Sequence, residues 1–376
     1  MKCHPRLVEP GWSPAVRRAL CRLIRLGAGQ GLPVVFDFDN TVVCGDIGEA
    51  TLAVLVRDGV IARDRIPPHV APAFVTAAGA PVSLEASVDA TEYYEAFLDP
   101  TAHGAQDSSP AANGYVWAVE IMQGLRPLDV VRATRTACEL AAPGKERLLE
   151  VTPGKTSYPL PFLYPESVEL IAELVRHEFD VWVVSASNVW SVRWMVLHGL
   201  NPALAARGVR KGLTADRVVG VSLLLADPQG GLHKDPVLVR RNRSYAAMDE
   251  RCLGSLRLTG RLHFPAPTYS GKIACLWDGL RRPPYLAAGE SPGDLPMLAF
   301  SQNRLWIARL EKPAYQVAAL RTRRESANGA WLVQPTLAKT ATRFVPDAPT
   351  ARRALGARAA SVKPGLAAYA SLARWP

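Results

Sequence analysis

The sequence predicts an α/β protein with a mostly parallel sheet, interrupted after its first strand by a mostly helical insertion. Short apolar segments at residues 34–36 and 181–184 have the length and composition of buried strands. The second segment directly follows a helix-type pattern at residues 165–179, and a helix that leads into a strand is half of a βαβ unit. Between the two strands, no long strand-type alternation occurs before about residue 163.

Length and composition are those of a globular protein with a large core. The 376 residues leave room for two or three structural units, and a hydrophobic content of 48% with a mean hydropathy of +0.03 is typical of soluble proteins. No run of 18 apolar residues occurs, so we expect no membrane span. Residues 1–9 lack the apolar stretch of a signal peptide, and the six cysteines include no Cys-x-x-Cys pair. We therefore expect free thiols and a cytoplasmic location.

Further helix and strand patterns follow in order along the chain. Pro14 opens an amphipathic helix pattern that glycines end before the first strand. A helix that begins beside Lys272 is expected to lead into a short apolar strand. The expected helices span residues 13–26, 46–55, 91–98, 116–122, 128–140, 165–179 and 273–280. The later strands are expected at residues 218–225, 257–264, 285–289 and 305–308, the first two as an antiparallel pair and the last at the end of the sheet.

The C-terminal segment is strongly basic. From Gln334 to the end, seven Lys and Arg residues face a single acid, Asp347, among many Ala, Pro, Gly and Ser residues. This composition favours a flexible, solvated tail. The alternative, docking on nucleic acid or on an anionic surface, is less favoured because only Phe344, Tyr369 and Trp375 could interleave with bases.

Two carboxylates and a hydroxyl follow the first strand at steps of two, at Asp37, Asp39 and Thr41. They lie at the carboxyl end of a buried strand, which is the edge where open α/β sheets bind ligands. Two carboxylates this close repel one another unless a cation lies between them or one holds a proton. A nucleophilic carboxylate beside an acid/base carboxylate meets that condition. The alternative is an ordinary strand-end turn.

Three later positions place polar groups at comparable points. Ser185 ends the second strand, Lys272 opens a helix, and Glu290 and Asp294 follow the strand at residues 285–289. Each alone is commonly a turn, surface or capping residue. Their order and their placement at strand ends and a helix start favour a shared site.

These residues resemble the four motifs of the haloacid dehalogenase superfamily, especially its phosphoserine phosphatase-like branch. The resemblance spans about residues 32–310 and implies a Rossmann-like three-layer core with a mostly parallel sheet and an inserted, mostly helical cap domain. It implies the following division of the chain. Residues 1–46 and 164–335 form the core, residues 47–163 the cap, and residues 336–376 the basic, flexible tail.

The resemblance also implies a role for each motif residue. Asp37 attacks phosphorus and becomes a phospho-aspartate, and Asp39 protonates the leaving oxygen and then activates water. Thr41 orients this pair, and the expected phosphate-binding residues are Thr41, Ser185 and Lys272. Mg²⁺ is the implied cofactor, with Asp37, Asp39 (through its backbone carbonyl), Glu290 and Asp294 as its ligands.

Reaction chemistry supports the same residues. A phosphate dianion repels a carboxylate nucleophile, so catalysis depends on cations and hydrogen-bond donors that offset this charge. Asp39 favours phosphoryl transfer because an alkoxide leaving group needs a proton. Glu290 departs from the Asp usual at its position, which leaves open whether Glu290 or Asp294 is the direct metal ligand. Lys234 is a rival for Lys272, which we prefer because its helix leads into the fourth motif.

The insertion offers candidate substrate contacts. Asp46 stands where phosphoserine phosphatases have an acid facing the substrate amine, but it is equally expected as a helix N-cap. Aromatic residues of the cap could form a pocket for a quaternary ammonium, as in a phosphocholine phosphatase, or could be packing residues of the cap. These aromatic residues are Tyr93, Tyr94, Phe97, Tyr115 and Trp117.

The sequence thus predicts a Mg²⁺-dependent phosphatase that hydrolyses a small phosphate monoester through an aspartyl phosphate. In one interpretation, the substrate has an amino or choline group. The expected partner is a small phosphorylated metabolite, with no membrane and no nucleic acid. Two alternatives stay open at this point: a non-catalytic phosphate-ligand or nucleic-acid binding protein on the same fold, and phosphoryl transfer to an acceptor other than water.

Overall fold

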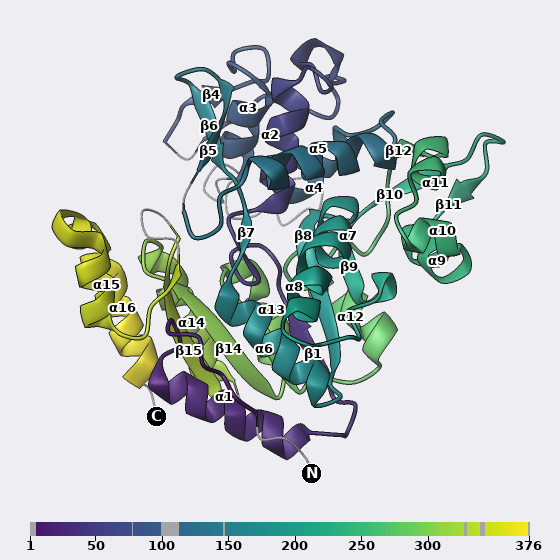
Figure 1. The fold of residues 1–376 in the computed structure, drawn as a ribbon. Coiled ribbons are helices and arrows are strands. Elements are labelled where there is room, and N and C mark those ends of the chain that lie inside the picture. The colour runs from purple at the N-terminus through teal and green to yellow at the C-terminus, as the bar shows by residue number, and fades with distance from the viewer. Residues whose placement is uncertain are drawn as a thin grey trace.

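A seven-stranded sheet forms the centre of the computed structural model, which describes residues 5–76, 78–98, 113–145, 147–326, 329–338 and 343–374. Its strand order is β16-β15-β14-β13-β1-β8-β9, and all neighbours are parallel except β15 and β16 (Figure 1). The predicted α/β class with a mostly parallel sheet is therefore confirmed. The strands are β1 (Pro33–Phe36), β8 (Asp180–Asn188), β9 (Val218–Val221), β13 (Leu286–Gly289), β14 (Asn303–Arg309), β15 (Trp331–Leu337) and β16 (Arg343–Phe344).

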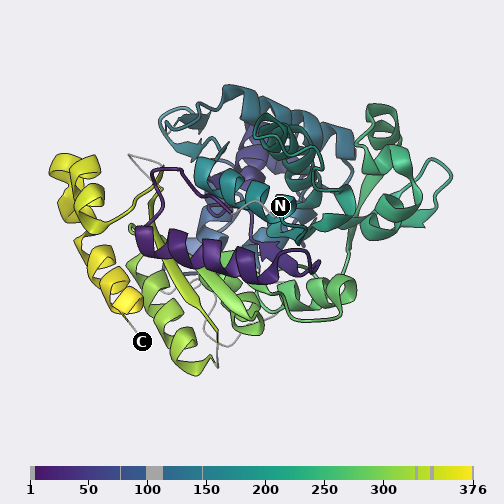
Figure 2. The same ribbon diagram turned by 60° about the horizontal axis from the view of Figure 1, so that its bottom comes forward.

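Helices cover both faces of this sheet, which makes three layers. Side chains of β1 alternate between the two faces: Val34 and Phe36 pack in the cluster of the first helical layer, and Val35 in that of the second. The first layer contains α1 (Pro14–Gly27), α6 (Pro165–Arg176) and α8 (Asn201–Ala206); α1 lies across the near side in Figure 2. The second contains α12 (Gly271–Leu280), α13 (Leu295–Phe300), α14 (Pro313–Glu325) and α16 (Lys363–Arg374). Among the helices described, none is long and apolar enough to cross a membrane.

The insertion after β1 is mostly helical, as expected, and includes two short hairpins that the sequence does not predict. It leaves and rejoins the core through an antiparallel pair, β2 (Val43–Cys44) and β7 (Phe162–Leu163). Its helices are α2 (Ile47–Arg57), α3 (Ala90–Leu98), α4 (Gly114–Glu120) and α5 (Pro127–Leu140), with a 3₁₀ turn η1 (Arg63–Arg65). Its hairpins are β3 (Phe74–Val75) with β4 (Pro81–Val82), and β5 (Leu148–Thr152) with β6 (Thr156–Pro159).

A second excursion from the core packs against this insertion. The strand expected at residues 218–225 is divided between β9 of the main sheet and β10 (Leu223–Ala226) of a small antiparallel sheet. The expected antiparallel partner of β10 is confirmed as β12 (Arg257–Leu262). The other elements of the excursion are β11 (Leu232–His233), α9 (Asp235–Arg241), α10 (Arg243–Ala246) and α11 (Glu250–Ser255). Its buried apolar side chains share one cluster with those of the insertion, including Leu52, Val130, Leu225 and Leu253.

This shared cluster bears on the domain division. The predicted cap of residues 47–163 does not bury its apolar surface alone, because residues 223–262 complete its core. The boundaries at residues 46 and 163 coincide with the two chain crossings beside β2 and β7. The division into core and cap stays a prediction.

The prediction of a flexible tail from residue 336 is wrong, because most of this segment is folded. β14 is not the last sheet strand: β15 and β16 follow it, and the tail then forms α15 (Ala348–Leu355), the 3₁₀ segment η6 (Gly356–Val362) and α16. Leu355, Leu366 and Leu372 are all buried. The segment therefore has an apolar face, which its high content of Lys and Arg conceals when only the composition is considered. Lys339 and Trp375 lie outside the described residues, as does Cys3 at the other end.

We expect Leu372→Ala to destabilise the whole core, because Leu372 of α16 is fully buried in the cluster that covers the second face of the sheet. A buried Leu-to-Ala change costs about 2–5 kcal/mol of unfolding free energy, measured by urea denaturation. Ser371→Ala, one residue earlier on the exposed side of the same helix, is the matched control and should change stability by less than about 0.5 kcal/mol. Equal stability of the two variants would contradict a packed C-terminal segment.

Candidate active site

The turn after β1 presents the first motif at the edge of the sheet. The backbone N–H of Asp37 still donates to the carbonyl of Ala288 in β13, at 2.9 Å, so Asp37 is held by the strand itself. Asn40 then adopts a left-handed conformation with φ of 55°, and its side-chain oxygen accepts from the N–H of Gly45 at 3.2 Å. Asn tolerates this conformation better than most residues. The turn therefore fixes the positions of both acidic side chains.

Lys272 joins the first motif to the fourth. Its ammonium lies 2.7 Å from Oδ1 of Asp37 and 2.5 Å from Oδ1 of Asp294, and all three side chains are buried. The hydroxyl of Thr41 donates to the other oxygen of Asp37 at 2.9 Å. Lys234, the rival for this position, precedes α9 and makes no contact with these acids in the described structure. Lys272 is thus the lysine that meets the candidate nucleophile.

Asp39 is turned toward the second motif. Its Oδ2 accepts hydrogen bonds from Ser185 at 2.7 Å and from Ser187 at 2.8 Å, while its Oδ1 accepts from the N–H of Ile47 at 2.8 Å. Ser187 also contacts Asp46 at 3.1 Å. The two serines lie two residues apart on β8, so both side chains are on the same face of the strand. Ser185 therefore contacts the acid/base candidate directly.

The fourth motif places its two acids in different environments. Oδ2 of Asp294 accepts from the N–H groups of Glu290 and Ser291 and from the Ser291 hydroxyl, each at 3.0 Å. The carboxylate of Glu290 instead pairs with Arg309, whose Nη1 lies 3.2 Å from its Oε2. Arg309 is the last residue of β14 and is mostly buried. A second cation therefore joins Lys272 at this edge of the sheet.

Burial shifts the ionisation of these groups. Desolvation, followed by repulsion from Asp294, raises the pKa of Asp37 well above its ordinary value. Desolvation and then the charge of Asp46 raise the pKa of Asp39 to about 7. Desolvation also raises the pKa of Glu290, which Arg309 opposes. For Lys272, burial alone would lower the pKa, but Asp294 and Asp37 raise it above its usual value.

The charge balance of these side chains would suit a divalent cation. The side chains described above comprise four buried carboxyl groups and two buried cations, so two negative charges are in excess when every acid is ionised. Buried carboxylates of this kind are stable only when paired or bound to a metal, and oxygen ligands suit Mg²⁺. Within the described ranges, no group of three or more His, Cys, Asp or Glu side chains converges on one metal position.

The insertion contributes further acids and tyrosines beside the site. Asp46 is the N-cap of α2, where its Oδ1 accepts from the N–H of Glu49 at 2.9 Å. The capping role is therefore observed, and a substrate role stays a prediction. Burial and nearby charges raise the pKa of both Asp46 and Glu49 to about 8. The hydroxyl of Tyr94 donates to Glu49 at 3.4 Å. Burial, followed by the nearby charge of Glu49, raises the pKa of Tyr115 of α4 well above its ordinary value.

The five aromatic residues predicted to form a pocket fall into two groups. Tyr93, Phe97 and Trp117 pack on one another, with ring centroids 5.0–6.2 Å apart, and form the core of the insertion. Tyr94 stacks on Trp117 with its ring but directs its hydroxyl to Glu49. Of the five aromatic residues, Tyr94 therefore contacts an acid beside the candidate site, and Tyr115 has a pKa raised by burial and by the same acid.

Three residues of this region were not predicted from the sequence: Ser187, Arg309 and Glu49. Ser187 follows Ser185 by two, and Arg309 ends a strand, so the strand-end rule applied to the first motif would have found both. Glu49 lies one turn into a helix, and nothing in its local sequence distinguishes it from a surface acid. The signal for Glu49 is only its distance along the helix from Asp46.

Comparisons with known proteins identify a relative in sequence and a solved structure with the same fold. No protein family model matches the chain. The phosphorylcholine phosphatase of Pseudomonas aeruginosa is 26% identical over 319 residues, which cover 81% of this chain and 83% of that protein. The structure of a functionally unknown protein from Anaerococcus prevotii shares the fold, with a TM-score of 0.56 and 16% identity over 91% of this chain and 97% of that one. A substrate-bound phosphoserine phosphatase has a TM-score of 0.36 with 13% identity, over 80% of this chain and 92% of that one.

We expect Lys272→Met to destabilise the protein in metal-free buffer by about 3–5 kcal/mol near pH 8, because it leaves buried carboxylates without their cation. The pKa of Asp37 is already raised, so the folded state takes up a proton there as the pH falls, and the repulsion is relieved. The loss should therefore shrink between about pH 8 and about pH 5 in urea denaturation. Lys363→Met, at an exposed position, is the control; an equal loss at both pH values would contradict charge neutralisation by Lys272.

Proposed function

We propose that this member of the haloacid dehalogenase superfamily, a phosphatase of its phosphoserine phosphatase-like branch, hydrolyses a small phosphate monoester through a covalent aspartyl phosphate on Asp37, with Mg²⁺ as cofactor. The observation that supports this best is the buried contact of Lys272 with both Asp37 and Asp294. A lysine between two carboxylates neutralises the nucleophile and leaves a cation where a phosphoryl oxygen would bind.

In the first step, a carboxylate oxygen of Asp37 attacks phosphorus, and the bond from phosphorus to the leaving oxygen breaks. Thr41 holds the side chain of Asp37 through its hydrogen bond to Oδ2, which fixes the line of attack. Lys272 offsets the charge of the phosphoryl group as it approaches the nucleophile. Asp39 donates its proton to the leaving oxygen, so the alcohol leaves neutral.

In the second step, Asp39, now ionised, takes a proton from water as the water oxygen attacks phosphorus. The bond between phosphorus and Asp37 breaks, inorganic phosphate leaves, and Asp39 regains the proton that it gave up. Hydrogen bonds from Ser185 and Ser187 favour the ionised form of Asp39, and burial favours the protonated form. A pKa of about 7 suits a residue that must act once as acid and once as base. Ser185 would bind a phosphoryl oxygen by redirecting its hydroxyl from Asp39.

Asp37, the backbone carbonyl of Asp39 and one of the two fourth-motif acids, Asp294 or Glu290, are the proposed Mg²⁺ ligands, and a bound cation would supply positive charge to the phosphoryl oxygens. Asp294 is the stronger candidate of the two fourth-motif acids. Its Oδ1 already shares Lys272 with Asp37, whereas Glu290 is held by Arg309. Glu290 would then not bind the metal directly, but would contact it through a water molecule or hold another ligand in position.

A cationic leaving group is the substrate class that we favour. The sequence relative is named as a phosphorylcholine phosphatase. In this chain, the acids Asp46 and Glu49 and the tyrosines Tyr94 and Tyr115 lie on the insertion side of the site. Carboxylates and aromatic rings together bind quaternary ammonium groups. Phosphocholine and related amino-alcohol phosphates are therefore the first substrates to assay.

We expect Asp37→Asn to lower phosphatase activity by ~10³-fold or more on every substrate, because the amide is not a nucleophile. The assay measures phosphate release from p-nitrophenyl phosphate, phosphoserine and phosphocholine, with Mg²⁺ and with EDTA. Phosphocholine should have the highest kcat/KM, and EDTA should abolish turnover of all three. Asp58→Asn, a partly exposed acid at the end of α2, is the matched control and should retain full activity. Retained turnover in Asp37→Asn would contradict the mechanism.

The alkaline limb of the pH profile should report Asp39. Because Asp39 must be protonated to release the alcohol, kcat/KM should fall about tenfold per pH unit above about pH 7. In Ser187→Ala, the carboxylate of Asp39 loses one donor, so its pKa should rise and the limb should move to higher pH. In Asp39→Asn, the remaining activity should have no such limb. A profile that stays flat to about pH 9 would contradict the role of Asp39 as the acid.

A further inference from the structure

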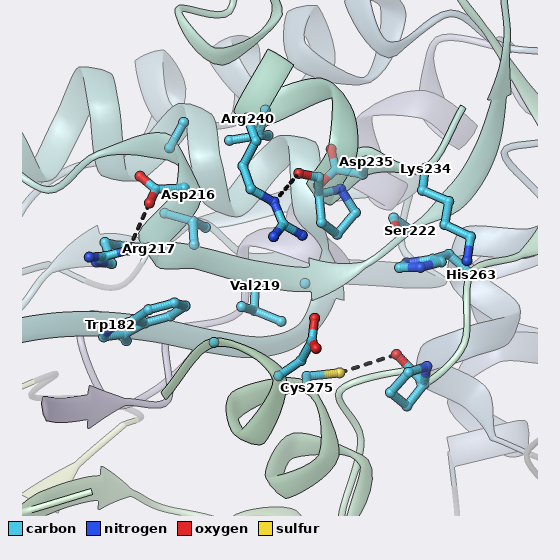
Figure 3. A pocket seen from close by; sticks show the side chains of 18 of the residues that line it. Trp182, Asp216, Arg217, Val219, Ser222, Lys234, Asp235, Arg240, His263 and Cys275 are labelled. Carbon is cyan, nitrogen blue, oxygen red and sulfur yellow. Dashed lines mark hydrogen bonds and ion pairs between the residues drawn. The ribbon is translucent and has the colours of Figure 1, made fainter. Parts of the chain in front are cut away.

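A cavity of about 610 Å³ lies away from the candidate active site, between the edge of the main sheet and the second excursion. Its walls come from β8 and β9, from α9, and from the outer side of α12 (Figure 3). None of the residues that line it is Asp37, Asp39, Ser185, Lys272 or Asp294. Its volume lies within the range of small-molecule sites, about 300–1,000 Å³.

The cavity has an excess of positive charge at one end. Lys234 and His263 line this end side by side, and Arg240 is directed into the cavity between them and Trp182 (Figure 3). Both Lys234 and Arg240 are exposed. Nε of Arg240 donates to the carbonyl of Pro236 at 3.0 Å. Neither Lys234 nor Arg240 forms an ion pair within the part of the chain that the structure describes. Burial and the charge of Lys234 lower the pKa of His263, which leaves a neutral ring as a hydrogen-bond partner.

A buried donor without an acceptor lies on the same wall. Arg193 is 1% exposed and lines the cavity, and both its terminal amines bind the carboxylate of Asp235, at 2.9 and 2.6 Å. Asp235 also accepts a hydrogen bond from the hydroxyl of Tyr245, so both of its carboxylate oxygens are already hydrogen-bonded. Nε of Arg193 has no hydrogen-bond partner among the described residues. An unpaired buried donor is costly, so this wall of the cavity retains unused hydrogen-bonding capacity.

The other end of the cavity is apolar and aromatic. Trp182 lines it under the guanidinium of Arg217, which lies 4.6 Å from the ring centroid and is itself neutralised by Asp180 and Asp216. Val219 of β9 lies between the two ends (Figure 3). The lining cations without an ion-pair partner among the described residues are therefore Lys234, beside His263, and Arg240, whereas the remaining acid of the lining, Asp278, pairs with Arg281 at 3.4 Å. This distribution suits a ligand with one charged end and one flat apolar end.

We propose that this cavity is a second ligand site, distinct from the phosphatase centre, that binds a small aromatic anion with its acidic group between Lys234, Arg240 and His263 and its ring against Val219 and Trp182. The acidic group would receive charge-assisted hydrogen bonds from the two cations. The proposal does not depend on the phosphatase mechanism, because no catalytic candidate lines the cavity.

The test is calorimetric titration of the full chain with naphthalene-1-sulfonate, an aromatic anion that a phosphatase cannot hydrolyse. We expect saturable binding of one molecule per chain, and binding about tenfold or more weaker in the double variant Lys234→Gln/Arg240→Gln. Arg241→Gln removes the same charge from the next residue of α9, outside the cavity, and should bind within about twofold of the unaltered protein. The neutral naphthalene-1-sulfonamide should bind more weakly than the sulfonate.

Phosphatase activity on p-nitrophenyl phosphate serves as the folding control and should be unchanged in the double variant. Three results would overturn the proposal. These are the absence of saturable binding, equal weakening in Arg241→Gln, and full binding in the double variant, which would place the probe elsewhere on the molecule.

Discussion

The shared contact of Lys272 with Asp37 and Asp294 is the interaction on which the rest of the site depends. Both carboxylates are buried, and each would be costly there without a cation. The contact requires the ends of β1 and β13 to be neighbours, and the two strands pair directly in the sheet. It also requires α12 to begin beside that edge. The strand order and the placement of α12 therefore bring three distant segments to one ammonium group.

The insertion is tied to this edge by polar as well as apolar contacts. The hydroxyl groups of Thr51, Thr134 and Ser191 lie 2.7–3.1 Å from one another, from α2, α5 and α7 (Val189–Met195) respectively. Helix α7 directly follows the strand that presents Ser185 and Ser187. A displacement of the insertion would thus also shift Ser185 and Ser187, which hold the side chain of Asp39. Since residues 223–262 pack on the same cluster, the insertion and the second cavity share one structural support.

The sequence predicts the core well because its signals are local. The strand pattern before Asp37, the proline that opens α6 and the glycine-rich turn at residues 289–294 each depend on a few adjacent residues, and all are found where expected. The motif residues were also found, because strand ends in a parallel sheet converge on one edge. The pairing of Glu290 with Arg309 follows the same rule, because β13 and β14 are parallel neighbours whose ends meet at that edge.

The misses have a common physical cause. The C-terminal segment was expected to be flexible from its charge, but folding is decided by whether a few apolar side chains such as Leu366 and Leu372 find a partner surface. The second excursion completes the core of the insertion through contacts between segments roughly 100 residues apart, which composition does not reveal. Ser187 was overlooked although it shares the strand face of Ser185, so that miss was avoidable.

The most direct test of the central claim is to find where the phosphoryl group resides during turnover. The protein is mixed with phosphocholine and Mg²⁺, quenched in acid within the first turnovers, digested and analysed by mass spectrometry. The account predicts a single phosphorylated peptide, modified at Asp37, that loses its phosphoryl group on treatment with hydroxylamine. Rapid phosphate release with an unmodified Asp37, or a phosphoryl group on another residue, would contradict it.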